Sequence, residues 1–165
     1  MKTNNPLQIC LWFDNQAEEA VNFYSSLFPN SKIGKIARYT SEGKEIHGQD
    51  EGKVMTIDFE LNGMKFIALN GGPIFKFNES MSICVMCDTQ EEIDYYWSEL
   101  TKEGAESYCG WLKDKFGVSW QIAPNVLSNM LSDENPRKVQ TVTAAFMQVR
   151  KFVIADLWTA FNSVK

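Results

Sequence analysis

Two similar stretches decide the fold of this chain: residues 8–24 read QICLWFDNQAEEAVNFY, and residues 82–97 read SICVMCDTQEEIDYYW. Each opens with a short, alternating apolar run typical of a strand and continues with apolar residues at helical spacing. Asp14 aligns with Asp88, and glutamates 18–19 align with glutamates 91–92 after a shift of one residue. The alignment predicts an internal repeat, with a period of about 74 residues.

Further strands follow each predicted helix. In the first copy, KIGKIARY (32–39) reads as a strand, and KVMTIDFELNGMKFIALNGG (53–72) reads as two strands around an Asn-Gly hairpin turn. The second copy has a short extended stretch near Glu106 and a hairpin, YCGWLKDKFGVSWQIAP (108–124). Its DKFG turn, with Gly117 left-handed, pairs Trp111 with Gln121. The chain therefore reads as βαβββ twice.

The segment after the second copy reads as helices, with Pro136 at one helix start. Asp14 or Asn15 is expected to cap the first helix of the repeat, and Asp88 and Thr89 the second. We interpret the chain as a single domain, 1–165, with module one at 5–72, module two at 80–124 and a helical tail at 125–165. The predicted class is α+β.

The amino-acid composition excludes some classes of partner. The 165 residues are 44% hydrophobic, with a net charge of −5 and no block of like charges. Nucleic-acid binding usually leaves a basic footprint, so a nucleic-acid partner is not expected. No apolar stretch approaches the length of a membrane span or a signal peptide, so a cytoplasmic protein without a membrane partner is expected.

The four cysteines are expected to stay reduced in the cytoplasm. Cys84 and Cys87 form a CVMC motif, but an odd spacing on a strand points the two side chains to opposite faces. No second CxxC follows. We therefore interpret the cysteines as buried thiols that pack as small hydrophobic residues.

The order and spacing of these segments resemble the vicinal-oxygen-chelate superfamily, which includes glyoxalase I and the bleomycin-resistance proteins. More narrowly, LWFDNQAEEAVNFYSSLFPNSKI (11–33), FIALNGGPIFKFNESMS (66–82), DTQEEIDYYWSEL (88–100) and CGWLKDKFGVSWQIAP (109–124) resemble PhnB-like proteins, which often carry a demethylubiquinone 3-methyltransferase-like label. The resemblance implies that the two modules curl into an incomplete barrel around a cavity.

The resemblance also implies a site. Metal enzymes of this superfamily place ligands on the first and fourth strands of each module. These positions correspond here to Gln8, Ala68, Ser82 and Gln121. Such metals need imidazole or carboxylate ligands, and the sole histidine, His47, lies in a polar loop. We therefore expect no metal and no cofactor.

The first hypothesis is a metal-free protein that binds a small, partly apolar organic ligand in the cavity. Gln121 would orient the ligand by hydrogen bonding, and Trp111 and Phe66 would form walls. Further ligand-binding positions would be Ala68, Gln8 and Ser82. No catalytic residue can be assigned.

The alternatives are a metal-dependent lyase, isomerase or dioxygenase of the same superfamily, or a methyltransferase as the family label suggests. LNGG (69–72) is the candidate glycine-rich loop for S-adenosylmethionine, but it is followed by PIFKF, which does not read as a helix. It reads better as a turn. Exposed sheet edges and the helical tail favour a homodimer.

Overall fold

The strands of the repeat form two sheets with the same topology. The computed structural model describes residues 7–164, and in this range the strands form two four-stranded sheets. Sheet one, in the order β1-β4-β3-β2, contains β1 (Ile9–Phe13), β2 (Ser31–Arg38), β3 (Val54–Leu61) and β4 (Met64–Asn70). Sheet two, in the order β5-β8-β7-β6, contains β5 (Ile83–Cys87), β6 (Ala105–Glu106), β7 (Trp111–Lys113) and β8 (Ser119–Pro124). The predicted repeat and the α+β class are confirmed.

Each sheet belongs to a compact unit of its own, and the boundary lies between Phe77 and Asn78. In each unit the first and fourth strands are parallel, and the remaining neighbours are antiparallel. A parallel pair needs a crossover connection, which the helix of each βαβββ module supplies. The helices are α1 (Ala17–Leu27), α2 (Lys44–His47), α3 (Gln90–Thr101), α4 (Asn125–Leu131), α5 (Pro136–Phe146) and α6 (Ile154–Asn162).

Unit one has its core between α1 and sheet one. Tyr24 of α1 stacks on Phe59 of β3, and Phe59 stacks on Phe66 of β4 at 5.0 Å between ring centroids. All three side chains are almost completely buried. The Asn62-Gly63 turn joins β3 to β4 with both residues at positive φ, as a two-residue hairpin turn requires.

The start of α1 differs from the sequence prediction. Its N-cap residue is Gln16, which makes no side-chain capping hydrogen bond, and neither Asp14 nor Asn15 takes that role. Instead, the backbone N–H of Ala17 donates to Oδ1 of Asn70, at the end of β4, over 2.8 Å. A residue 53 positions away in sequence therefore satisfies an orphan donor of this helix.

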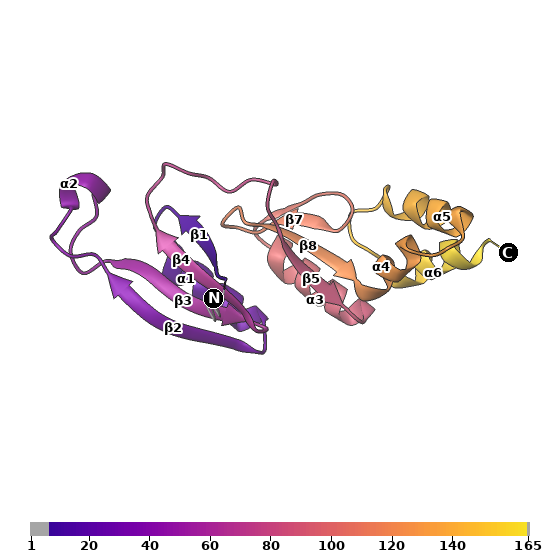
Figure 1. Cartoon of the computed structure of the whole chain (residues 1–165), viewed down its shortest axis with the longest axis horizontal. Coiled ribbons are helices and arrows are strands. Elements are labelled where there is room, and N and C mark those ends of the chain that lie inside the picture. Colours follow the sequence, from indigo (N-terminus) through magenta and orange to yellow (C-terminus); the bar gives the residue numbers. More distant parts are fainter. Residues whose placement is uncertain (1–6, 165) are drawn as a thin grey trace, which may run out of the picture. The chain divides into compact units, whose positions relative to one another are not determined.

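Unit two repeats the arrangement with α3 packed on sheet two (Figure 1). Ile93, Trp97 and Leu100 of α3 are buried, as are Trp120 and Ile122 of β8. Thr89 caps α3 as predicted: its side chain accepts from the Glu92 N–H, and the Glu92 carboxylate accepts from the Thr89 N–H. This capping box fixes where α3 begins.

The β7–β8 hairpin has the predicted register. Trp111 pairs with Gln121, and Leu112 pairs with Trp120. Gly117 has φ +86°, the left-handed conformation that the turn demands.

Beyond β8, the chain continues within unit two through α4, α5 and α6, which follow the end of that strand (Figure 1). Pro136 stands in the first turn of α5, and the side chain of Asn135 caps that helix through the Arg137 N–H. The predicted Pro136 start is confirmed. Among residues 7–164, no helix is both long and apolar enough to cross a membrane.

The interpretation of the cysteines as buried is correct for Cys87 and wrong for the other three. Cys87 is buried, but Cys10 and Cys84 are exposed and Cys109 is partly exposed. The alternation of a strand explains the difference within CVMC, because Cys87 lies on the face covered by α3 and Cys84 lies on the opposite face.

Candidate functional site

The face of sheet two that points away from α3 carries the predicted residues of module two. Gln121 is partly exposed, whereas its neighbours Trp120 and Ile122 are completely buried on the α3 side. Strand pairing places Cys84 on one side of Gln121 and Trp111 on the other. Directly paired residues share a face, so these side chains form a row across three strands, which we call the open face.

A hydrogen bond orders the polar part of the open face. Nε2 of Gln121 donates to Oγ of Ser82 over 2.8 Å. Ser82 immediately precedes β5, and Gln121 lies in β8, so the bond joins the first and fourth strand positions of module two. The structure thus brings Gln121, Ser82 and Trp111 together on one surface.

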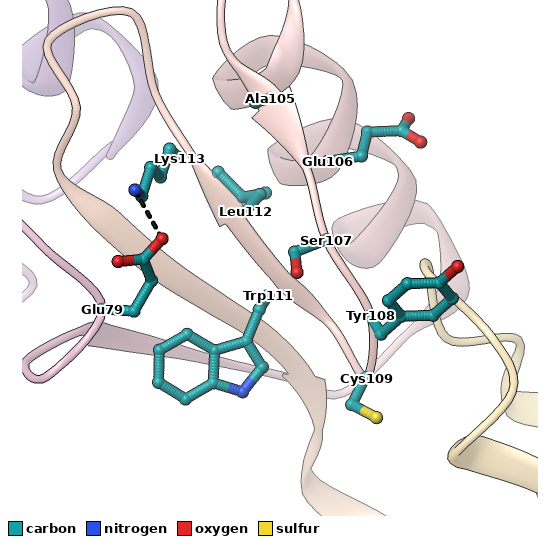
Figure 2. Close-up of a pocket in the computed structure, with 9 residues that line it drawn as sticks. All are labelled: Glu79, Ala105, Glu106, Ser107, Tyr108, Cys109, Trp111, Leu112 and Lys113. Carbon is teal, nitrogen blue, oxygen red and sulfur yellow. Dashed lines mark ion pairs between the residues drawn. The ribbon is translucent and has the colours of Figure 1, made fainter.

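A depression of about 590 Å³ continues the open face toward the β6 edge. Figure 2 shows the Trp111 indole and Glu79 on one side of it, Tyr108 and Cys109 on the other, and Ser107 between them. The lining residues are Glu79, Ala105, Glu106, Ser107, Tyr108, Cys109, Trp111, Leu112 and Lys113. The volume lies within the range of small-molecule sites.

An ion pair stands at one side of the depression. Nζ of Lys113 lies 2.5 Å from Oε1 of Glu79, and Figure 2 shows this pair above the Trp111 ring. The hydrogen bond from Lys113 is the main cause that lowers the pKa of Glu79. Glu79 is therefore a carboxylate at neutral pH, and both partners are exposed enough to exchange this contact for a ligand.

Sequence reasoning did not identify the part of this surface beyond Trp111. Ser107, Lys113 and Ala105 lie on the open face because β6 pairs with β7 in the register Ala105 to Lys113, and the Ser107 N–H continues the pairing to the Trp111 carbonyl. The sequence could have indicated this, because Lys113 lies two residues after Trp111 on one strand and so shares its face. The contribution of Glu79, which precedes β5, required the folded chain.

The predicted residues of unit one lie apart from one another. Gln8 is exposed and borders a shallow depression of about 210 Å³ with Asp58 and Lys65. Phe66 and Ala68, by contrast, are 1% and 0% exposed on the side of sheet one that faces α1.

The placement of Phe66 and Ala68 among the ligand-binding residues therefore needs correction. Cys10 pairs with Ile67 in sheet one as Cys84 pairs with Gln121 in sheet two. The counterpart of Gln121 is Ile67, and the sequence assignment to Ala68 is shifted by one residue. On a strand, a shift of one residue exchanges the two faces.

The side chains at the inferred ligand positions do not fit the divalent metal that the family resemblance implies. Gln8, Ser82 and Gln121 offer amides and a hydroxyl, and Ile67 and Ala68 offer no donor atom. Zinc and related metals bind imidazole, thiolate or carboxylate. Within residues 7–164, no group of three or more His, Cys, Asp or Glu side chains is arranged to hold a metal ion.

His47 and LNGG have local structural contacts. The Nδ1 atom of His47 accepts from the Gln49 N–H over 3.0 Å, and Nε2 lies 3.1 Å from the Glu42 carbonyl. In LNGG, a Cβ at Gly71 would lie 2.3 Å from the Trp12 ring, and the Trp12 indole donates to the Gly72 carbonyl. Between LNGG and β5 the chain forms an irregular connection that contains no helix.

Comparisons with known proteins identify the family and the fold. Residues 5–123 match the model of the family described as 3-demethylubiquinone-9 3-methyltransferase. No curated protein matches the chain. Among solved structures, a PhnB protein from Bacillus cereus is 38% identical, with a TM-score of 0.64, over 73% of this chain and 99% of that one.

More distant structures share the fold. Protein PA1353 from Pseudomonas aeruginosa is 18% identical, with a TM-score of 0.57, over 72% of this chain and 98% of that one. The fosfomycin resistance protein FosX from Listeria monocytogenes is 11% identical, with a TM-score of 0.55, over 79% of this chain and 98% of that one.

Proposed function

Because the chain belongs to the 3-demethylubiquinone-9 3-methyltransferase family of PhnB-like proteins, within the vicinal-oxygen-chelate superfamily, we propose that it binds a small, partly apolar organic ligand on the open face of sheet two without a metal. The observation that carries the proposal is the Gln121–Ser82 hydrogen bond at the first and fourth strand positions. A neutral amide and a hydroxyl occupy the place where metal chemistry would need charged or imidazole donors.

The proposed contacts follow from the arrangement. With Nε2 bound to Ser82, Gln121 keeps its Oε1 atom as an acceptor, and Ser82 keeps its O–H as a donor. Trp111, paired with Gln121, presents an aromatic surface beside these polar groups. Few polar contacts next to an apolar wall suit a flat organic molecule. For unit one, Gln8 stays a predicted polar contact of a ligand.

A fluorescence titration tests the proposal. The probe is anilinonaphthalene sulfonate, a flat aromatic anion. Trp111→Ala should weaken its binding by about tenfold, because the loss of an aromatic contact costs about 1.4 kcal/mol or more. Trp158→Ala is the matched control, since Trp158 is an exposed tryptophan of α6 outside the depression.

A second pair of variants tests the polar contacts. Gln121→Ala should lower the affinity for the probe, while Gln140→Ala, on the exposed surface of α5, should leave it unchanged. Equal affinity of Trp111→Ala and wild-type protein would contradict the proposal. So would a stoichiometric divalent metal in the purified protein that is lost in Gln121→Ala.

The family description makes methyl transfer the second candidate. Methyl transfer requires binding of S-adenosylmethionine, and many such enzymes hold it with a glycine-rich loop between a strand and a helix. LNGG leads into no helix here. Isothermal titration with S-adenosylmethionine discriminates the two functions, because measurable heat of binding would favour the transferase.

We also infer self-association as a homodimer. β2 is an edge strand of sheet one, and Ile33 and Ile36 on it are 47% and 49% exposed. Unpaired edge strands with exposed apolar side chains are sites of strand-to-strand association. Sedimentation equilibrium of wild-type protein and of Ile36→Lys checks this inference, and a wild-type monomer at all concentrations would contradict it.

A further inference from the structure

The chain carries a segment that the family does not account for. The family model ends at residue 123, and α4, α5 and α6 follow it. The Bacillus cereus relative is covered over 99% of its length by 73% of this chain. The connection between α5 and α6, residues 147–153, contacts the loop that lines the depression, and we call it the tail connection.

The tail connection pairs with the loop that forms one wall of the depression. The Cys109 N–H donates to the Val149 carbonyl, and the Gly110 N–H donates to the Arg150 carbonyl, each over 2.8 Å. Cys109 and Gly110 both have positive φ, at 56° and 79°. This conformation turns two successive N–H groups outward, and the tail connection supplies their acceptors.

The Arg150 side chain ties the same wall to the sheet. Its guanidinium lies over the Tyr108 ring, 5.5 Å from the centroid, and Nη1 is 3.6 Å from Oε2 of Glu106. The other carboxylate oxygen of Glu106 accepts from the Trp97 indole over 3.0 Å. Arg150 therefore links a ring at the rim of the depression to a buried tryptophan of α3.

The tail connection is itself held on α3. Nε2 of Gln90 donates to the Phe152 carbonyl over 3.1 Å, and Oε1 of Gln90 accepts from the Ile154 N–H over 2.9 Å. Lys151 forms an ion pair with Asp94. The tail connection thus joins α3 to the Tyr108 wall, and a displacement of one would break contacts with the other.

We propose that the tail connection is a specificity element of the ligand site, that Arg150 is a positioning residue acting through Tyr108, and that the ligands selected are planar aromatic molecules. The proposal rests on the proposed function. Tyr108 presents an exposed ring and Trp111 a partly exposed ring at the two sides of the depression, with Ser107 between them (Figure 2). A fixed Tyr108 ring favours a flat aromatic partner, which can stack on it, over a flexible aliphatic one, which gains no stacking and loses its own conformational freedom on binding.

The test compares two probes, anilinonaphthalene sulfonate and octane sulfonate, the second measured by displacement of the first. Arg150→Ala should weaken binding of the aromatic probe by about three- to fivefold, the size expected of an exposed cation–π contact, and leave octane sulfonate binding unchanged. Arg150→Lys should restore most of the affinity because it keeps the charge. Arg137→Ala, an exposed arginine of α5, is the matched control.

A double-mutant cycle identifies the route of the effect. If Arg150 acts through Tyr108, then Arg150→Ala should have no further effect in a Tyr108→Ala background. An additive effect would overturn the proposal, as would equal losses for both probes or wild-type affinity of Arg150→Ala. Failure of Trp111→Ala to weaken binding would instead overturn the proposed function, so the two failures are distinguishable.

Discussion

The indole Nε1 of Trp120 donates a hydrogen bond of 2.8 Å to Oδ2 of Asp114, and both side chains are buried at the β7–β8 hairpin. The other carboxylate oxygen, Oδ1, accepts from the backbone N–H groups of Phe116 and Val118. One aspartate thus accepts hydrogen bonds from the turn backbone and from the fully buried indole of Trp120. The open face depends on this hairpin, because the hairpin sets the register between Trp111 and Gln121.

Asp114→Ala should therefore lower the free energy of unfolding by about 3 kcal/mol, since it leaves buried donors without an acceptor. Asp114→Asn keeps the shape and one acceptor oxygen and should cost less. Urea denaturation followed by tryptophan fluorescence measures both. Glu91→Ala, at an exposed position of α3, is the control. A change for Asp114→Ala no larger than the control would contradict the prediction.

Gly110 and Gly117 should respond differently to alanine, although both have positive φ. A Cβ at Gly110 would lie 2.5 Å from the Phe152 ring and 2.6 Å from the Ile122 carbonyl oxygen, whereas one at Gly117 would meet nothing within 4 Å. Gly117→Ala should cost only the left-handed strain of about 1–2 kcal/mol. Gly110→Ala adds a steric clash and should lower the unfolding free energy further.

Thermal unfolding of the two glycine variants side by side checks this difference. The comparison is well matched because both residues lie in unit two and have φ within a few degrees of each other. Equal losses would mean that the contact of Phe152 with Gly110 does not restrict the loop.

Asn70→Ala should destabilise unit one by about 2 kcal/mol or more. Its Oδ1 accepts from the Ala17 N–H, and its Nδ2 donates to the Val54 carbonyl over 3.0 Å, so the variant leaves both backbone groups unsatisfied. Asn15→Ala should have little effect, because Asn15 is exposed and does not cap α1. Urea denaturation of both variants measures the difference. A larger loss of stability for Asn15→Ala than for Asn70→Ala would instead support Asn15 as the cap of α1.

The stability of the protein should fall above about pH 9 because of Cys87. Burial raises the pKa of this thiol from 9.0 to about 12, with a smaller contribution from the Glu92 and Asp88 carboxylates. Between these values the unfolded chain loses the proton and the folded chain keeps it. The stabilisation is thus complete below pH 9 and is lost as the pH rises toward 12.

Cys87→Ala should make the unfolding free energy less dependent on pH in this range. Cys84→Ala is the matched control, because Cys84 lies in the same strand and is exposed. Denaturation curves at about pH 8 and about pH 10.5 provide the measurement. A Cys87→Ala variant with the same alkaline loss as wild-type protein would show that Cys87 is not the source.

The sequence predicted the parts of the fold that local chemistry specifies. Asn62-Gly63 and Gly117 each have the conformational freedom that a tight turn needs, and the turns then set the registers of their hairpins. Thr89 and Glu92 form a capping box whose signature lies within four residues. For the same reason the Trp111–Gln121 pairing could be predicted residue by residue.

Packing between distant segments decided other features. α3 ends at Thr101, and a Cβ at the following Gly104 would lie 2.1 Å from the Lys113 carbonyl oxygen. Close approach to β7 thus explains this glycine.

The sequence by itself determined the repeat, the order of strands and helices along the chain, and the absence of metal-binding side chains at Gln8, Ser82 and Gln121. These features depend on residue identity and on short-range periodicity. Only the tertiary structure decided that Phe66 and Ala68 face α1, that Asn70 accepts from the Ala17 N–H of α1 and that Arg150 meets Tyr108. The physical reason is that a strand alternates its faces at every residue, and contacts between distant segments form only when the chain packs.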